Sequence, residues 1–244
     1  MHEPHWITNL LNSLFAGPVD ALLNLVGVHP PNPARPINDT FALELLVALG
    51  LILFFAIVRM NLSVENPGAM QQVAEIIHEF TGSHSEQIIG HGYERFQAFV
   101  TCIFLFVIVN NLLGLVPGIV TPTSAPVVPL GLACCTFIYY NFYGLKEQGI
   151  AGYLKHHAGP IWWIWPLLFP IEIVSNLARV MSLTIRLYAN MFASDMVTLA
   201  FFSLFPVVIP AVFLGLHAFV SLIQAYVFML LSMIYLGIAT AHEH

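Results

Sequence analysis

The stretch Glu172–Asp195, EIVSNLARVMSLTIRLYANMFASD, places two arginines and two carboxylates inside a long apolar region. An arginine at the centre of a bilayer costs from about 3 to more than 10 kcal/mol, so it normally has a partner and a function. Arg179 and Arg186 follow Glu172 at intervals of seven residues, which keeps all three on one side of a helix. Asp195 comes nine residues after Arg186 and therefore points to the opposite side. The sequence predicts one helix with a cationic stripe on one side and a carboxylate on the other.

Composition identifies a membrane protein. Apolar residues make up 58% of the 244 residues and charged residues only 8%, with a mean hydropathy of +0.82, whereas a soluble domain is about 25% charged. A net charge of −6 and only seven Lys and Arg argue against nucleic acid as a partner. The three cysteines have no spacing typical of a metal site or a disulfide, so we expect neither metal nor cofactor.

The chain is predicted to form an N-terminal interfacial segment, residues 1–40, and a single transmembrane helical domain, residues 41–244. The first 28 residues have the pattern of an amphipathic segment on the membrane surface. Residues 29–38 hold four prolines, which makes them a non-helical connector. The fold class is therefore an all-α membrane protein, whose ion-conducting core we place at about residues 160–240.

Apolar runs predict about five transmembrane helices, at about 41–58, 97–116, 127–143, 171–205 and 211–240. The third is expected to end in a polar loop. A separate amphipathic helix around residues 70–80 is expected on the membrane surface. The last two helices are each about 45–50 Å long, against a hydrocarbon core of about 30 Å. Length alone leaves open whether such helices tilt, kink or project from the core.

Basic residues set the predicted orientation. With five crossings, Arg59, Arg95, Lys146 and Lys155 share one side of the membrane, and Arg35 alone lies on the other. Because positive residues concentrate on the cytoplasmic side, the N-terminus is predicted outside and the C-terminus in the cytoplasm.

Further polar groups accompany the two arginines. Four polar side chains share one face of the last predicted helix: His217, Ser221, Gln224 and Tyr235. Asn190 follows Arg186 by four residues and lies on nearly the same face as that arginine. Such groups could serve only to hold the two helices together through interhelical hydrogen bonds. Gln or Ser would do this at a lower desolvation cost than arginine. The pattern favours a hydrated ion route.

The two arginines differ in what surrounds them in the sequence. Arg179 lies closer to Glu172, so it is either a secondary group of the route or an interfacial, salt-bridged residue. Arg186 has no carboxylate three or four residues away; its counter-charge must come from another helix or another subunit. A secondary ion or solute transporter with a charged mid-membrane site is the alternative, although the 172–195 pattern has no second copy in the chain.

The segments SLTIRLYANMFASD and HAFVSLIQAYVFMLLSMIYL resemble the C-terminal half of subunit a of the F-type ATP synthases. In that family an arginine is followed by an asparagine at four residues and a carboxylate at nine. The next helix carries a histidine, a glutamine seven later and a tyrosine near its end. The matching residues here are Arg186, Asn190, Asp195, His217, Gln224 and Tyr235. The resemblance is strongest over about residues 170–240, and upstream the turn NNLLGLVPG also fits.

The resemblance implies a non-catalytic subunit of the membrane sector, CF(0), in the bacterial inner membrane. Its partners would be lipid, a rotating ring of c subunits and the b subunits of the peripheral stalk. Arg186 would face the ring between two offset half-channels. Four residues would line the route from outside: Asp195, Asn190, His217 and Gln224. Glu172 would lie towards the cytoplasmic exit.

Two points stay open in this resemblance. Asp195 stands where many relatives have glutamate, one methylene longer, so its reach to His217 is undecided. A proton is the default coupling ion, but sodium selectivity is set largely by the ring subunit. In the family, the ion flow drives ATP synthesis.

We expect the two long helices to form an antiparallel pair, steeply inclined to the bilayer normal so as to follow the cylindrical ring.

Overall fold

The computed structural model describes residues 6–25, 35–116, 119–158, 165–204 and 208–240. These residues contain seven α-helices and one 3-10 turn, and no strand. The prediction of an all-α protein is thereby confirmed. The chain divides into two compact units, Met1–Ile57 and Val58–His244.

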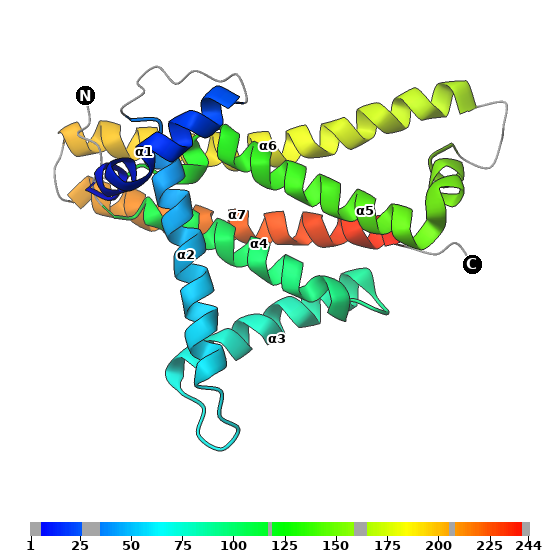
Figure 1. Ribbon diagram of the computed structural model, residues 1–244, viewed down its shortest axis with the longest axis horizontal. Helices are drawn as coiled ribbons and strands as arrows, with labels where there is room; N and C mark the ends of the chain where they lie inside the picture. Colours follow the sequence, from blue (N-terminus) through cyan, green and yellow to red (C-terminus); the bar gives the residue numbers. More distant parts are fainter. Residues whose placement is uncertain (1–5, 26–34, 117–118, 159–164, 205–207, 241–244) are drawn as a thin grey trace. The chain divides into compact units, whose positions relative to one another are not determined.

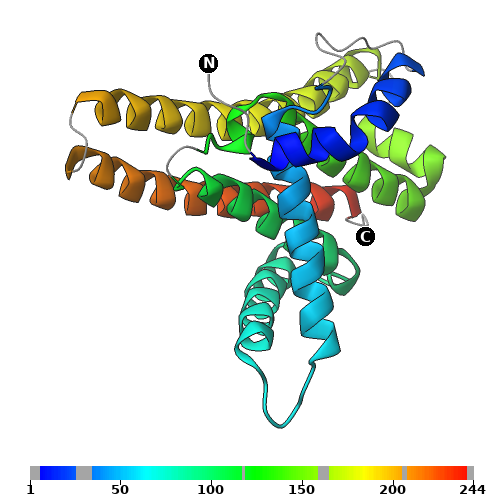
Figure 2. The same ribbon diagram turned by 60° about the vertical axis from the view of Figure 1, so that its left-hand side comes forward.

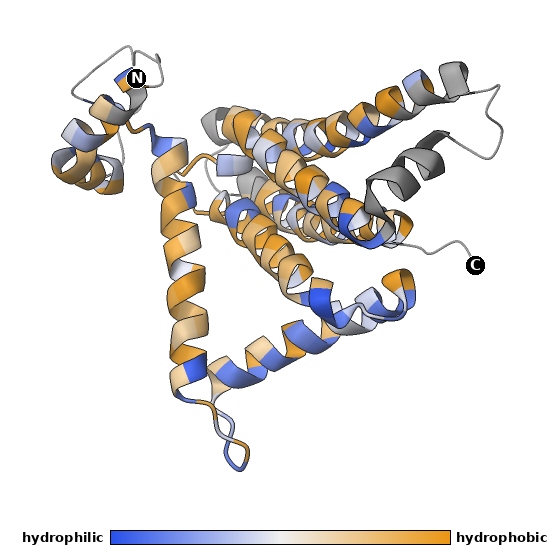
Figure 3. Cartoon of the chain, turned by 45° about the vertical axis from the view of Figure 1, so that its right-hand side comes forward, coloured by the Kyte–Doolittle hydropathy of each residue, from blue (hydrophilic) through white to orange (hydrophobic). Residues whose placement is uncertain are grey.

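The first unit contains helix α1 (Trp6–Leu25) and most of helix α2 (Asp39–Met60). Polar contacts tie α1 to the start of α2. Asn12 donates to the Ile37 carbonyl at 3.0 Å and accepts from the Ile37 N–H at 3.1 Å, while the Thr8 hydroxyl donates to the Asp39 carboxylate at 2.5 Å. Along α2 most of the surface is hydrophobic (Figure 3), as expected of a helix that faces lipid.

The second unit contains the remaining elements: α3 (Ala69–Ile89), α4 (Glu94–Leu113), the 3-10 turn η1 (Pro122–Ser124), α5 (Val127–Ala158), α6 (Trp165–Leu204) and α7 (Val208–Thr240). Helices α6 and α7 run antiparallel, side by side, in both ribbon views (Figures 1 and 2). Helix α5 packs along both of them, and α4 packs on α7. Turn η1 lies against α6 and α4, and this contact proves central to the site.

Four described helices are long and apolar enough to cross a membrane: Asp39–Met60, Glu94–Leu113, Val127–Glu147 and Ala211–Thr240. They correspond to four of the five predicted crossings. The described part of α6 does not belong to this set. A crossing by α6 stays a prediction.

The polar loop predicted after residue 143 is wrong. Helix α5 continues to Ala158 and is 32 residues long. The charged residues of this stretch are typical of a loop, yet Lys and Glu are good helix formers and neither proline nor a terminating turn interrupts the run. Arg95, at the start of α4, pairs with Glu147 on this extension at 2.5 Å.

Helix α3 is amphipathic, as predicted, but it packs by its small polar face. Thr81 and Ser85 are fully buried, whereas Val73 and Ile76 are exposed. The Thr81 and Thr101 hydroxyls lie 2.8 Å apart and connect α3 to α4. The apolar side chains of Val73 and Ile76 are therefore not covered by the described residues of the second unit.

The core of the second unit consists of two apolar clusters. One joins α4, α5, α6 and α7 through Ile103, Val107, Ala133, Leu183, Leu187, Met191, Ala225 and Phe228. The other lies among α4, α5 and α7 and contains Phe96, Val100, Tyr140, Met229, Met233, Leu236 and Ala239. Between them these clusters fix the rotation of α6 and α7 about their own axes.

Candidate functional site

The rotation of α6 decides which of its polar residues are buried. Leu183, Leu187 and Met191 are spaced four apart and are at most 3% exposed, so they define the inward face of the helix. Asp195 is the next position in this series and is 7% exposed. Arg186 and Asn190 lie on the outward face and are exposed. The predicted division of α6 into two polar sides is what the structure contains.

The carboxylate of Asp195 is held by one residue of the segment before η1. The Thr121 hydroxyl donates to Oδ1 at 2.8 Å and the Thr121 N–H donates to Oδ2 at 3.2 Å. Thr121 is itself 1% exposed. Two bonds to a carboxylate fix its orientation as well as stabilising its charge.

His217, on α7, is 1% exposed and lies beside Asp195. Its Nδ1 is 3.8 Å from Asp195 Oδ1, which is longer than a hydrogen bond but short enough for an ion pair with a protonated imidazole. Nδ1 is also 2.7 Å from the Ser194 hydroxyl, and Nε2 is 3.1 Å from the Asn111 carbonyl oxygen. The imidazole therefore has a polar neighbour at each nitrogen.

A second layer of contacts connects this cluster to α4 and η1. The Thr123 hydroxyl donates to Asn111 Oδ1 at 2.6 Å, and Ser221 is fully buried with its hydroxyl directed at the Met191 sulfur, 3.9 Å away. Gly114 closes the site from the end of α4. A Cβ on Gly114 would collide with Thr121 Oγ1 and would lie 2.8 Å from His217 Nε2.

Arg186 has a different environment. It forms neither an ion pair nor a hydrogen bond with any residue that the structure describes. The preceding residue, Ile185, is 53% exposed, so the guanidinium stands beside an apolar side chain on a face that the described residues leave open. A charge in such a place is normally balanced by a group of opposite sign, and the described residues do not supply one to Arg186.

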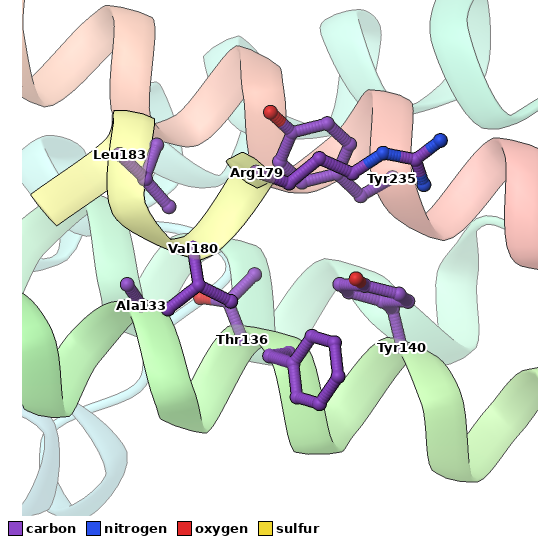
Figure 4. A pocket seen from close by; sticks show the side chains of 8 residues that line it. Ala133, Thr136, Tyr140, Arg179, Val180, Leu183 and Tyr235 are labelled. Atoms are coloured by element: carbon purple, nitrogen blue, oxygen red, sulfur yellow. The ribbon is translucent and has the colours of Figure 1, made fainter. Parts of the chain in front are cut away.

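Arg179 and Tyr235 form a second polar site, between α5, α6 and α7. The guanidinium carbon of Arg179 lies 5.5 Å from the centre of the Tyr235 ring, within the range of a cation–π interaction. Both residues line a small cavity with Thr136 and Tyr140 (Figure 4). The space open to a water molecule there is about 10 Å³, roughly one water.

The structure gives less detail on two other predicted site residues, Gln224 and Glu172. Gln224 is 9% exposed, on the inward side of α7 with Ser221. Glu172 belongs to α6, but its side chain lies outside the described residues. The structure thus brings Asp195, His217 and Ser221 towards one site and Arg179 and Tyr235 to another, and it leaves Arg186 and Asn190 on the open face.

Sequence reasoning missed Thr121, Thr123, Ser194 and Asn111 as members of the cluster. The sequence contains a feature that could have identified Asn111, because this residue belongs to an Asn–Asn pair near the end of an apolar helix. Thr121 has no such feature: it meets Asp195 across 74 residues of chain, and only the tertiary position of η1 brings the two together.

Comparison with known proteins gives consistent matches over most of the chain. The family model described as ATP synthase A chain matches residues 40–237. A protein of Koribacter versatilis named ATP synthase subunit a is 53% identical over 243 residues, covering 99% of each chain. The protein of that name from Solibacter usitatus is 45% identical, covering 96% of this chain and 100% of its own length. The one from Solidesulfovibrio magneticus is 38% identical, covering 84% and 83%.

Proposed function

Because the chain belongs to the ATP synthase subunit a family, a component of the membrane sector, we propose that it conducts protons through two offset half-channels on either side of Arg186. The protons would pass on and off a rotating ring of c subunits and so couple the gradient to ATP synthesis. The observation that carries this proposal is the contrast along α6 between an exposed Arg186, which has no partner among the described residues, and a buried Asp195 bonded to Thr121.

Arg186 would stabilise the ionised carboxylate of each c subunit as it passes. An opposite charge within a few ångströms lowers the pKa of a carboxyl group, whereas in lipid the same group must be neutral. Arginine suits this role because it does not lose its proton. The same positive charge repels cations and would keep the two half-channels separate.

The positions of the polar sites along α6 support an offset. Arg179 precedes Arg186 by seven residues and Asp195 follows it by nine, which at 1.5 Å per residue are separations of about 10 and 14 Å in opposite directions. We assign Asp195, His217, Asn190 and Gln224 to the route from outside. Glu172, Arg179 and the cavity beside Tyr235 belong to the route towards the cytoplasm.

Orientation, inclination and partners complete the proposal. The N-terminus faces outward and the C-terminus faces the cytoplasm, following the distribution of basic residues. Helix α6 has 40 residues, about 60 Å of helix against a core of about 30 Å, so α6 and α7 lie steeply inclined along the ring. The b subunits of the peripheral stalk hold the chain against rotation, and the chain itself performs no catalysis.

The first test is chemical crosslinking in the assembled complex. With Cys102, Cys134 and Cys135 replaced by serine, Ile185→Cys on the open face of α6 should crosslink to a c subunit. Ile138→Cys on α5 is the matched control, because it is 66% exposed but is on another helix. Failure of Ile185→Cys to crosslink to any c subunit, or equal crosslinking from both positions, would contradict the proposed ring interface.

The second test identifies the ion. Vesicles containing the whole complex should acidify on addition of ATP at a rate independent of sodium, and a protonophore should abolish the gradient. A requirement for sodium in this assay would contradict proton coupling while leaving the ring interface intact.

A further inference from the structure

The two nitrogens of His217 have neighbours of different kinds. Nε2 is 3.1 Å from the backbone carbonyl oxygen of Asn111, and a carbonyl oxygen can only accept a hydrogen bond. Nε2 must therefore carry a hydrogen in both the neutral and the protonated imidazole. In the neutral ring Nδ1 then has the free lone pair, and the Ser194 hydroxyl, 2.7 Å away, donates to it.

We propose that Ser194 is a positioning residue of the proton route. Together with the Asn111 carbonyl it holds neutral His217 in the tautomer with hydrogen on Nε2 and leaves Nδ1 as the atom that accepts the moving proton. This inference rests on the proposed function, since it concerns the outer half-channel assigned to Asp195 and His217. It assigns a role to a side chain that the sequence pattern did not single out.

The donor of that proton is Asp195, the one described carboxylate within ion-pair distance of His217. In the step, the O–H bond of protonated Asp195 breaks and an N–H bond forms at Nδ1. The neutral pair becomes a carboxylate and an imidazolium, so the total charge is unchanged. The gap of 3.8 Å between Nδ1 and Oδ1 is closed by a small side-chain movement or by one bridging water.

Ser194 takes part through the two roles of its hydroxyl. When Nδ1 is unprotonated the hydroxyl donates to it, and when Nδ1 carries a proton the hydroxyl turns and its oxygen accepts. The Nε2 hydrogen stays on its nitrogen because the Asn111 carbonyl accepts a hydrogen bond from it, so the proton that His217 exchanges is the one on Nδ1. Thr121 keeps the carboxylate of Asp195 in place throughout, with bonds to both oxygens.

The matched variants are Ser194→Ala and Ser194→Thr. Alanine removes the hydroxyl at a helical position where it folds well, and threonine restores the hydroxyl with an added methyl group. We expect ATP-driven pumping by the assembled complex to fall about three- to tenfold with Ser194→Ala, the effect of one lost hydrogen bond. Ser194→Thr should retain most of the rate.

Nitrogen NMR of histidine-labelled complex gives a readout that a merely structural role would not change. The signals of His217, assigned by their loss in His217→Gln, should show hydrogen on Nε2 and a hydrogen-bonded, unprotonated Nδ1. Ser194→Ala should shift Nδ1 towards the value of a free lone pair. Wild-type His217 with hydrogen on Nδ1 and none on Nε2, or unchanged pumping in Ser194→Ala, would overturn the inference. Arg186→Ala in the same assay separates the outcomes: normal pumping in Ser194→Ala but none in Arg186→Ala would reject only the role of Ser194.

Discussion

The two sides of α6 differ in the burial and hydrogen bonding of their charged groups. On the inner side Asp195 is 7% exposed and both of its carboxylate oxygens accept hydrogen bonds from Thr121. On the outer side Arg186 is exposed and bonds to no described residue. The buried group is explained by contacts within the chain, since an unbonded carboxylate there would be costly. The exposed group has no such explanation among the described residues, and the proposed function assigns its partner to the c subunits.

This contrast separates stability from function. Removing a bonded, buried group disturbs its neighbours and should affect both properties. Removing an exposed, unbonded group should leave the fold unchanged and affect only what the missing partner does. Variants on the two sides of α6 can therefore test whether this contrast holds.

The largest effect is expected at Arg186. Arg186→Ala should abolish ATP-driven pumping and allow passive proton leak, because no fixed charge then separates the half-channels. Arg186→Lys should lose at least about tenfold in rate, since lysine lacks the planar fork that holds a carboxylate through two bonds and can be deprotonated by desolvation. Pumping and conductance are measured in vesicles that contain the assembled complex.

The control for Arg186 is Ile185→Ala, one residue away and 53% exposed. It should keep most of the pumping rate, and both variants should assemble with the thermal stability of the wild type. Near-normal pumping by Arg186→Ala would remove the basis of the proposed function.

The next effect concerns Asp195 and His217. Asp195→Asn and His217→Ala should each slow proton flux by about tenfold or more, because each removes one group of a proton-transfer pair. Since the two groups act in one route, the double variant should cost less than the sum of the single changes in free energy of activation. Additive effects would show that the two residues act independently, although their atoms lie 3.8 Å apart.

A smaller effect is expected on the inner side at Gly114. Gly114→Ala places a Cβ against Thr121 and 2.8 Å from His217 Nε2, and overpacking of this kind costs about 1–3 kcal/mol. Gly131→Ala on α5 is the matched control, because its Cβ would meet nothing within 4 Å; it should be neutral or stabilise by up to about 1 kcal/mol. Thermal unfolding of the purified complex measures both. Equal stability of the two variants would show that the site tolerates displacement of the imidazole.

The sequence predicted the sides of α6 because they depend only on helical periodicity. Nine residues at about 100° each reverse the direction of a side chain, so Arg186 and Asp195 had to face opposite ways on any regular helix. The partners of Asp195 could not be predicted in the same way. Thr121 reaches it through the packing of η1 against α6, which depends on core contacts such as those of Met191 with α4 and α7.

Local composition was less reliable than periodicity. The composition of the polar stretch after residue 143 predicts a loop, although α5 continues through it to Ala158. On α3 the apolar residues Val73 and Ile76 predict a helix on the membrane surface; they are exposed, and the buried side of the helix carries Thr81 and Ser85. In a membrane protein apolar side chains also face lipid, so an apolar stripe does not show which side of a helix packs on protein.

The smallest effect is expected at Arg95, which provides a second exposed arginine for the comparison. Its side chain is 55% exposed, like Arg186 on the outside of the protein, but it pairs with Glu147 at 2.5 Å. Its partner is thus within the chain, and the pair ties the start of α4 to α5. An exposed ion pair contributes about 0–1 kcal/mol and is screened by salt. Arg95→Gln should therefore lower the unfolding temperature only slightly, and the variant should pump near the wild-type rate.

The measurements are thermal unfolding of the purified complex and ATP-driven pumping in vesicles, each at low and at high salt. Any small loss of stability should disappear at high salt. A loss of pumping as large as that of Arg186→Ala would mean that any exposed arginine of this chain is needed, and that the absence of a partner among the described residues is not what distinguishes Arg186.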